Sequence, residues 1–406
     1  MFYGWRVVGA CFVAAVFTWG FGVFGGSVYL KVIVNDHGWT TALVSSALTV
    51  FYLTNAVSLP AIGAGIDRWG SRFIIAGGAA LLAIGVASVG RLASLWQLYA
   101  AFMCMGVGYA TMSVTGLSAT IAPWFERHQG RSVALALTGA SVGAMLVVPL
   151  LVLAISRLGF AMATTYAAGA IVLVMTPLAL IVFRHSGPAA LGLERDGGAP
   201  PPAEHASAPD APAQGAEDAT PPARSFALWS IAIGFALGLM VQVGFLTHHY
   251  ALAAPMIGAE RAGLLVGATG LAGLLGRLLL ARVIDQVDPR RYSICIFATQ
   301  IVVLTTFAIW PTVPVLIPVS LIYGFCLGQI TTLSPIVVRR EFGAAAFGSI
   351  YGVAGSAIQF FSAFGPVFYG ALVTGFGDYA PVLAVAAGFK AAAILMLFAG
   401  RRRNRA

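Results

Sequence analysis

Charged residues are scarce in this sequence, and their scarcity excludes a soluble globule. Asp, Glu, Lys and Arg together make up 9% of the 406 residues, whereas a soluble globular protein carries about 25%. Hydrophobic residues reach 59% and gather in runs of helical length, not in the alternating ten-residue segments of a membrane barrel. The composition therefore predicts an all-α membrane protein that is surrounded by the lipid bilayer.

Cysteines and catalytic motifs are equally scarce. The four cysteines, Cys11, Cys104, Cys295 and Cys326, lie in apolar runs without the spacing of metal ligands, so we interpret them as small core residues. The sequence contains no phosphate-binding glycine loop, no GxGxxG motif that follows a strand and no Ser/His/Asp arrangement. We therefore expect neither an enzyme nor a cofactor or metal site.

Twelve apolar segments are long enough to cross a membrane as helices. They cover residues 7–32, 42–66, 73–91, 95–122, 132–156, 160–183, 226–252, 259–284, 292–311, 313–338, 346–373 and 381–400. The first segment has no small-residue cleavage site, so we expect an uncleaved helix rather than a signal peptide. A stretch rich in Pro, Ala and Gly separates six segments from six. It predicts an N-terminal six-helix bundle (1–184), a flexible cytoplasmic linker (185–225) and a C-terminal six-helix bundle (226–406).

Positive charge is distributed unevenly between the two sides of these helices. With the N-terminus inside, seventeen of the 23 Lys and Arg residues fall on the inner side and four on the outer side, while Arg277 and Lys390 lie within spans. The positive-inside rule then places both termini in the cytoplasm. Topology accounts for the net charge of +9 without a nucleic-acid partner. We expect a multi-pass protein of the bacterial plasma (inner) membrane.

Arg277 is the charge that most needs an explanation. A guanidinium near the middle of a membrane helix costs at least ~2.5 to 3.5 kcal/mol, so such residues normally face a wet cavity and mark a substrate path. All fourteen Asp and Glu residues fall in loops, in the linker or at helix ends, so none is an obvious partner. A free, bidentate donor suits a carboxylate carried by a ligand. The alternative is a structural arginine bonded to backbone carbonyls and water.

The two halves of the chain contain an internal repeat. Ile66-Asp67 followed by Arg72 matches Ile284-Asp285 followed by Arg290 at an offset of 218 residues. Two parallel six-helix copies, related by an axis along the membrane normal, are the architecture of the major facilitator fold. In that fold the binding site lies between the halves near the midplane.

The loop after the second span carries a family motif. Gly63 to Arg72, GAGIDRWGSR, resembles the superfamily's G-x-x-x-D-R-x-G-x-R motif. The resemblance implies a charge clamp that holds one access state closed until the halves rock. The implied gating residues are Gly63, Asp67, Arg68, Gly70 and Arg72, with Asp285 and Arg290 in the second half. The alternative is a solvated, positively charged inner loop.

Further segments resemble one branch of that superfamily, the bacterial monocarboxylate and oxalate:formate transporters. They are YGWRVV at residues 3–8, HGWT at 37–40, WFER at 124–127, GFCLG at 324–328 with Ser334-Pro335, and FGSIYG at 347–352. In that branch an arginine of the eighth helix contacts the substrate carboxylate. The matching position here is Arg277.

The sequence also departs from this branch. Gly273 stands where animal lactate transporters carry an aspartate implicated in proton coupling, and their first-helix lysine falls near Gly25 or Gly26. Ile358 or Gln359 stands where oxalate carriers have a second cation. A single central cation favours a monoanion over a dianion, because a second carboxylate would stay desolvated and unmatched.

Several polar residues in the spans could line a binding site. Tyr109 and Ser113 are four residues apart, which predicts one helix face near mid-depth. The others in this sparse lining are Gln242, Tyr323, Tyr351 and Gln359. The alternative for each is ordinary packing between helices.

Three further groups could carry protons or charge. His248 and His249 titrate near neutral pH by their ordinary values, so they are possible proton carriers, although a pair in the headgroup region is the simpler expectation. Lys390 lies at the centre of the last span, which is peripheral in this fold. We expect its stem to reach toward an interface rather than to contact substrate.

These observations predict a secondary active transporter that moves a small monocarboxylate, such as lactate or pyruvate, by alternating access, coupled to protons. A carboxylate uniporter or an anion exchanger is the alternative, because arginine alone cannot release a proton at physiological pH. Drug or metabolite efflux is a rival, but it often uses a membrane-buried acid that is lacking here. A non-transporting membrane sensor would more naturally carry a folded signalling domain.

Overall fold

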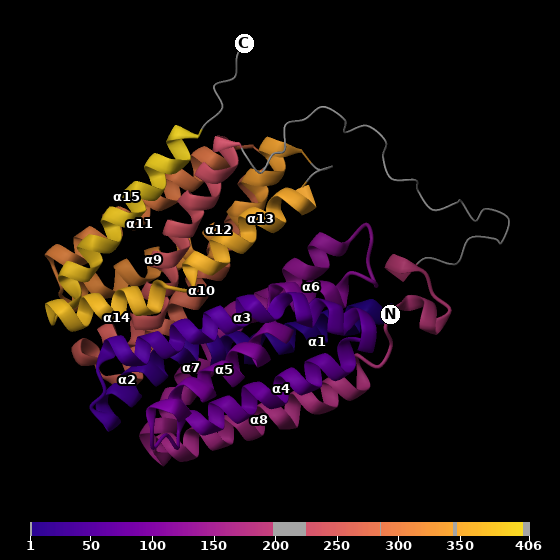
Figure 1. Ribbon diagram of the computed structural model, residues 1–406, viewed down its shortest axis with the longest axis horizontal. Helices are drawn as coiled ribbons and strands as arrows, with labels where there is room; N and C mark the ends of the chain where they lie inside the picture. Colours follow the sequence, from indigo (N-terminus) through magenta and orange to yellow (C-terminus); the bar gives the residue numbers. More distant parts are fainter. Residues whose placement is uncertain (1, 198–224, 285, 344–346, 401–406) are drawn as a thin grey trace, which may run out of the picture.

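The computed structural model describes residues 2–197, 225–284, 286–343 and 347–400 (Figure 1). All regular structure in these ranges is helical, and twelve helical segments are long and apolar enough to cross a membrane. The prediction of an all-α membrane protein is confirmed. Asp285 lies outside the described residues, as do positions 198–224 of the predicted linker.

The first half contains six crossings, two of which are interrupted. Their bounds are α1 Tyr3–Phe17, η1 Thr18–Phe24 and α2 Gly25–His37; α3 Thr41–Trp69; α4 Ser71–Val89; α5 Leu95–Thr111 with α6 Val114–Ile121; α7 Gln129–Leu158; and α8 Phe160–Ile181. The short segment η1 is a π-helix within the first crossing.

The second half repeats this arrangement. Its bounds are α9 Phe226–Ile257; α10 Ala259–Val283; α11 Pro289–Ile309; α12 Val313–Phe342; α13 Phe347–Ser362 with α14 Gly365–Phe376; and α15 Tyr379–Ala399. Here the eleventh crossing is the interrupted one.

Single glycines reverse the chain between several helices. Gly70, Gly159 and Gly258 have φ values of +78°, +80° and +85° and join α3 to α4, α7 to α8 and α9 to α10. Residues with a Cβ rarely adopt this backbone region. These positions therefore permit hairpins with almost no connecting loop.

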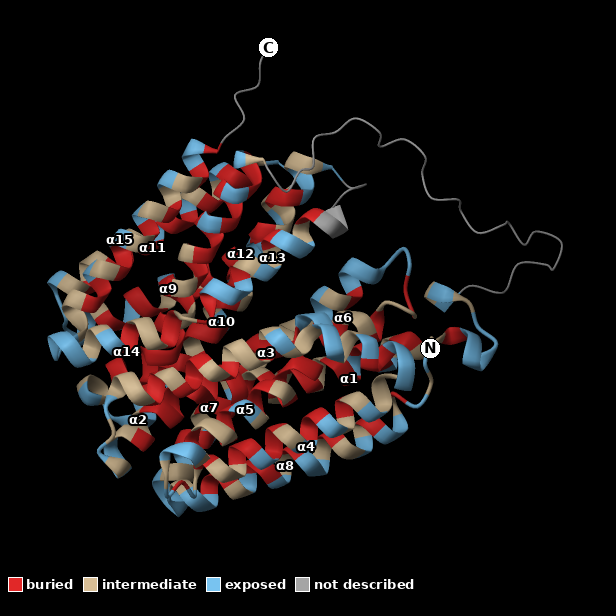
Figure 2. Ribbon diagram, viewed as in Figure 1, coloured by how far each residue is buried: buried red, intermediate tan, exposed pale blue. Residues whose placement is uncertain are grey.

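The two halves lie side by side and share a core at one end only (Figures 1 and 2). We call the end where α1 begins and α15 ends the inner end, and the opposite end the outer end. One buried cluster joins residues of both halves, among them Leu30, Leu48 and Tyr369, whereas a second cluster contains residues of the C-terminal half alone, among them Phe235 and Val338. The core that the halves share therefore lies toward the outer end, and the inner part of the C-terminal half has a core of its own.

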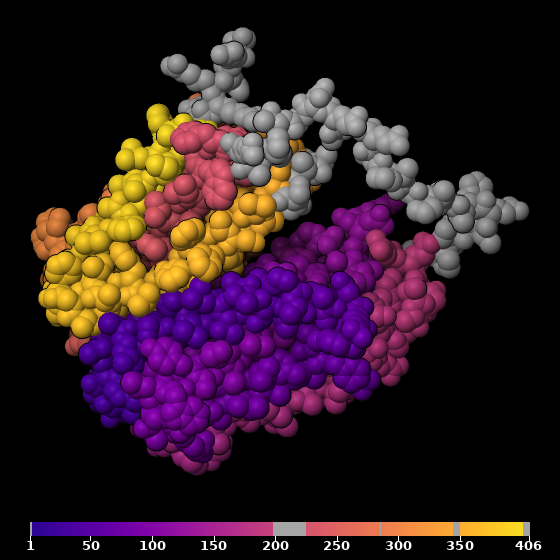
Figure 3. Space-filling view, in the orientation of Figure 1, coloured from indigo at the N-terminus to yellow at the C-terminus, as the bar shows by residue number. Residues whose placement is uncertain are grey.

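Hydrogen bonds between α3 and α14 hold the outer end closed. The Ala42 N–H donates to Thr374 Oγ1 and the Val367 N–H donates to Thr49 Oγ1, each at 3.1 Å. Toward the inner end α13 draws away from α3, and Figure 3 shows a cleft between these two surfaces. The structure is thus closed at the outer end and open at the inner end.

The beginning of the linker is folded against the N-terminal half. Residues Pro188–Leu191 and Arg195–Gly197 form two short 3-10 helices. The Asp196 N–H donates to the Trp124 carbonyl at 3.0 Å, and its carboxylate accepts from the backbone N–H groups of Glu126 and Arg127 at 3.0 and 2.9 Å. The prediction of a flexible chain is wrong for this part, because one well-placed carboxylate satisfies donors in the turn that leads into α7.

Candidate functional site

Arg277 spans the boundary between the halves. Its Nε donates to the Gly328 carbonyl of α12 at 3.1 Å, and an Nη donates to the Leu137 carbonyl of α7, in the other half, at 3.5 Å. It lies six residues before Val283, the last residue of α10, so it is about 9 Å from that helix end. This is closer to the inner end than the predicted mid-span position.

The charge of Arg277 has no acidic partner in the part of the chain that the structure describes. A guanidinium has five N–H donors, and the two carbonyl bonds use only two of them. The longer bond, to Leu137, is at the limit of hydrogen-bond geometry. The half-buried side chain therefore retains donors for a further group.

Close glycine packing brings α12 within reach of Arg277. A Cβ at Gly328 would lie 1.8 Å from the Gly273 carbonyl oxygen, and a Cβ at Gly276 would lie 2.1 Å from the Phe325 carbonyl oxygen. A Cβ at Gly273 itself would lie 3.2 Å from the Gly324 carbonyl oxygen. Gly273 is thus part of a tight contact between α10 and α12, which leaves little room for the aspartate of the animal lactate transporters.

Gln242 on α9 and Tyr323 on α12 are buried, and each carries an oxygen atom without a hydrogen-bond partner among the described residues. Gln242 Oε1 and the Tyr323 hydroxyl make no hydrogen bond within the described ranges, and the same holds for the Tyr369 hydroxyl of α14. Tyr323 packs on Phe245 with ring centroids 4.0 Å apart. Because a buried, unpaired polar group is costly, these groups are expected to meet water or a ligand.

Tyr109 belongs to an aromatic cluster in the N-terminal half. Its ring lies 5.3 Å from the ring of Trp19 in η1 and 5.3 Å from that of Phe51 in α3. A Cβ at Gly22 would lie 3.2 Å from the Tyr109 ring. Sequence reasoning missed Trp19 and the π-helix that presents it. π-segments within helices often occur at functional sites, and the available signal was the alternation of glycine and aromatic residues, TWGFGVFGG, at residues 18–26.

Ser113 does not share a helix face with Tyr109. Helix α5 ends at Thr111, and Ser113 caps the next helix: its Oγ donates to the Ala110 carbonyl at 2.9 Å and accepts from the Gly116 N–H at 3.5 Å. The predicted common face is therefore wrong, because the hydroxyl stabilises a break in the crossing. Gln359 is exposed on α13.

The two histidines lie inside the protein, so the headgroup location is wrong. Each is 1% exposed. His248 Nε2 lies 3.1 Å from Ser45 Oγ and its Nδ1 lies 3.0 Å from the Tyr379 hydroxyl, whereas His249 Nε2 lies 2.9 Å from Ser320 Oγ. Helix α9 contacts other helices on several sides at this depth, which excludes these rings from the interface.

Lys390 is also buried, contrary to the expectation that its stem reaches an interface. Its Nζ donates to the Gly238 carbonyl at 2.7 Å and to Gln300 Oε1 at 2.6 Å, and lies 4.6 Å from the centre of the Phe297 ring. These partners on α9 and α11 surround the ammonium group within the C-terminal half. A position on a peripheral helix therefore does not imply exposure.

The predicted gating residues differ between the two halves. Asp67 and Arg68 are exposed and form no ion pair within the described residues, and Arg68 and Arg72 lie over the rings of Trp69 and Phe73. No atom lies within 4 Å of a Cβ built on Gly63, and Gly70 forms the hairpin between α3 and α4.

Arg290, by contrast, is buried, and each nitrogen of its guanidinium has a partner. It contacts both carboxylate oxygens of Glu341 at 2.9 and 2.8 Å, the Leu397 carbonyl at 2.6 Å and Ser230 Oγ at 2.6 Å. Sequence reasoning missed Glu341, which lies 51 residues away on α12. Arg72 and Arg290 therefore occupy matching positions in the sequence repeat but make different contacts.

Comparison with known proteins agrees with the fold. A curated relative, the MFS transporter asaE of Aspergillus flavus, is 23% identical over 289 residues, which make up 69% of this chain and 60% of that protein. The chain thus matches about three fifths of the relative's length.

Solved structures show the same fold at low identity. The nucleoside transporter NupG has a TM-score of 0.75 at 12% identity, with 98% of this chain and 100% of that chain covered. The D-xylose-proton symporter has a TM-score of 0.74 at 13% identity, with 98% of each chain covered. A bacterial homolog of the lysosomal transporter Spinster, in an inward-facing and occupied conformation, has a TM-score of 0.70 at 14% identity, with 97% and 94% covered.

The sequence model of the Major Facilitator Superfamily matches residues 10–254, which is more than half of the chain. Together with the helical architecture, this match shows that the protein belongs to the Major Facilitator Superfamily of membrane transporters.

Proposed function

We propose that this transporter moves a small monocarboxylate, such as lactate or pyruvate, across the bacterial plasma membrane, with both termini in the cytoplasm. The observation that carries the proposal is the side chain of Arg277. It lies between the halves, has no acidic partner among the described residues and keeps unused N–H donors. A carboxylate would form charge-assisted, two-bond contacts there that a neutral carbonyl cannot match.

The contact between Arg277 and Leu137 suggests how binding acts on the halves. The 3.5 Å bond joins α10 to α7 across the boundary and is the weaker of the two carbonyl bonds. A substrate carboxylate that replaces it would change the balance between the two access states, since a ligand shifts an equilibrium by its differential affinity. One cation at this place matches one carboxylate, which favours a monoanion.

The remaining candidates take supporting roles in this proposal. Gln242 and Tyr323 offer unpaired polar groups, Tyr109 offers an aromatic wall, and Gln359 is exposed on α13. The Ser113 hydroxyl stabilises the interruption of the helix that follows Tyr109. Coupling to protons needs a titrating group other than arginine, for which His248 and His249 are the candidates.

Counterflow in proteoliposomes tests the proposal. Labelled lactate, pyruvate, formate, oxalate and acetate are offered to the wild type and to the Arg277→Ala variant. We expect counterflow of a monocarboxylate that the variant loses. Carboxylate exchange without a response to a proton gradient would favour a uniporter or exchanger. Flux of lipophilic cations without any carboxylate flux would favour efflux, and the absence of all flux would favour a sensor.

A further inference from the structure

His248 ties the two halves together at the outer end. It lies on α9 of the C-terminal half, and its Nε2 is 3.1 Å from Ser45 Oγ on α3 of the N-terminal half and 3.3 Å from the Pro366 carbonyl oxygen. Its Nδ1 is 3.0 Å from the hydroxyl of Tyr379 on α15. Both nitrogens of this buried ring therefore have partners, and the Ser45 contact joins His248 to the other half.

The neighbouring histidine offers a natural contrast. His249 is equally buried, but its Nε2 bonds to Ser320 within the same half and its Nδ1 has no partner among the described residues. Its ring stacks on Phe245, with centroids 5.1 Å apart. A change in the charge of His249 would therefore act within one half, whereas a change at His248 would act on the interface between halves.

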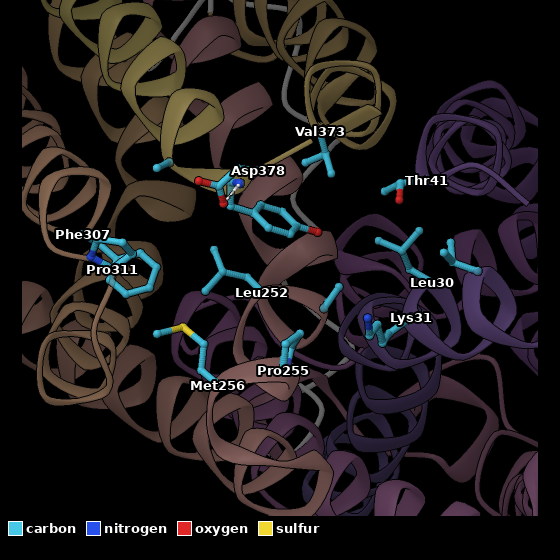
Figure 4. Close-up of a pocket in the computed structure, with 14 residues that line it drawn as sticks. Leu30, Lys31, Thr41, Leu252, Pro255, Met256, Phe307, Pro311, Val373 and Asp378 are labelled. Carbon is cyan, nitrogen blue, oxygen red and sulfur yellow. Dashed lines mark hydrogen bonds between the residues drawn. The ribbon is translucent and has the colours of Figure 1, made fainter. Parts of the chain in front are cut away.

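A pocket at the outer end gives His248 a connection to the outer solution. The pocket has a volume of about 430 Å³ and is lined by residues of both halves, including Tyr379. Figure 4 shows Lys31 and Asp378 on opposite sides of it. Because Tyr379 both lines the pocket and bonds to His248 Nδ1, its hydroxyl connects the pocket to the buried ring.

We propose that His248 is the residue through which an external proton opens the outer gate, and that Tyr379 relays the proton from the pocket. The tyrosine oxygen accepts a proton from hydronium in the pocket and passes its own hydroxyl proton to His248 Nδ1. One proton moves from hydronium to the imidazole, hydronium becomes water, and the tyrosine ends unchanged. This inference rests on the proposed alternating access coupled to protons.

The physical reason is the lack of an acid beside the ring. The groups that contact His248 are Ser45 on α3, the Pro366 carbonyl and the Tyr369 ring on α14, and Tyr379 on α15; no carboxylate is among these contacts. An imidazolium has two donors and no acceptor, so the hydroxyl of Tyr379 can no longer donate to it. A buried charge without a counter-ion is costly, and opening the interface to water removes that cost.

The distance between spin labels at the outer end tests the proposal without any substrate. The labels are attached to Asp36→Cys and Thr312→Cys, two exposed positions in opposite halves, after the four native cysteines are replaced. The full chain is reconstituted in lipid, and distance distributions are compared at pH 7.5 and 5.5. Because protonation of an imidazole becomes more favourable as the pH falls, we expect the longer-distance population to rise at least about twofold over this interval.

Matched variants test whether His248 is the residue that responds to pH. His249→Gln should respond to pH as the wild type does, and His248→Gln should show no response. Tyr379→Phe should open more slowly after a pH jump, which keeps the relay testable if His248→Gln folds poorly. A response that survives in His248→Gln, is lost equally in His249→Gln, or is absent from the wild type would overturn the proposal. Because no carboxylate is used, these results are independent of the counterflow result for Arg277.

Discussion

At the scale of single residues, Arg277 and Lys390 show how two cations in apolar spans differ. Lys390 donates to Gly238 and Gln300 within one half and is not exposed at all. Arg277 is half-buried, contacts both halves and keeps unused donors. The cost of burying charge marked both residues as unusual, but only tertiary contacts separate a structural cation from a candidate binding residue.

We expect Arg277→Lys to retain the charge and still lose most transport. An ammonium is a point charge and cannot form the planar two-bond contact with a carboxylate, so substrate affinity should fall at least about tenfold, or ~1.4 kcal/mol. Binding and counterflow are measured at matched expression. Arg282→Lys, an exposed change on the same helix, is the control and should leave both unchanged. Substrate affinity near that of the wild type in Arg277→Lys would contradict the anchor role.

Asp196 allows a prediction with a defined pH range. Although desolvation acts to raise its pKa, hydrogen bonds from the backbone N–H groups of Arg127 and Glu126 and from His128 lower the pKa of the Asp196 carboxyl to about 2. Since this value lies below the ordinary value of about 3.9, the carboxylate stabilises the folded linker segment above about pH 4. That stabilisation is lost as the pH falls toward about 2.

The anisotropy of a dye on Arg195→Cys measures this docking. With the four native cysteines replaced, anisotropy should stay high from pH 7 to about 4 and fall as the pH approaches 2, following the range set by the carboxyl. The added Asp196→Asn change should lower it at every pH, because an amide cannot accept these bonds as strongly as a carboxylate. A dye on Arg91→Cys, at the outer end, is the control. High anisotropy at pH 7 with Asp196→Asn would show that the carboxylate does not hold the segment.

At the scale of helices, the sequence predicted the positions of the membrane crossings well but did not predict the interruptions within them. The prolonged apolar runs located all twelve crossings, since length and hydropathy alone define them. The π-helix at Thr18–Phe24 and the break between α5 and α6 were not predicted, because both depend on local backbone contacts such as the Ser113 cap. The break between α5 and α6 separates Tyr109 from Ser113, which the helical spacing had predicted to lie on one face.

The close contact between α10 and α12 leads to a prediction about the effect of a larger side chain at Gly328. Gly328→Ala should force them apart, since its Cβ would lie 1.8 Å from the Gly273 carbonyl oxygen, and overpacking of this kind typically costs about 1 to 3 kcal/mol. It should also displace the carbonyl that binds Arg277 Nε, so that thermal stability and substrate affinity both fall. Unfolding of the purified protein and substrate binding are the measurements.

Gly169→Ala on α8 is the matched control for this substitution. A Cβ there meets no atom within 4 Å, and alanine is the better helix former. Its stability should therefore be unchanged or slightly higher. If Gly328→Ala unfolds at the same temperature as Gly169→Ala, α10 and α12 are not in close contact at Gly328 in the purified protein.

At the scale of the whole molecule, the distribution of the core explains which state the structure represents. One buried cluster joins both halves near the outer end, while the inner part of the C-terminal half has its own cluster. The internal repeat predicted two bundles, but no pattern in the sequence indicates which end is closed. That depends on contacts between distant residues, such as Ala42 with Thr374.

The exposed Asp67 provides a test of the rocking motion between the halves. In this inner-open state it forms no ion pair within the described part of the chain, so its charge is available to act when the inner end closes. Asp67→Asn should therefore disfavour the inner-closed state and slow the cycle, while substrate affinity at Arg277 changes little, because a gate biases populations without touching the ligand.

Binding and flux are measured together with the accessibility of single cysteines placed at the two ends. In Asp67→Asn we expect flux to fall severalfold, with increased labelling at the inner end and decreased labelling at the outer end. Asp36→Asn, an exposed acid near the outer end of α2, is the control for the loss of one negative charge. If flux and labelling at both ends match the wild type, the inner loop acts only as a solvated connection, and the closing of the inner end must depend on other contacts between α3 and the C-terminal half.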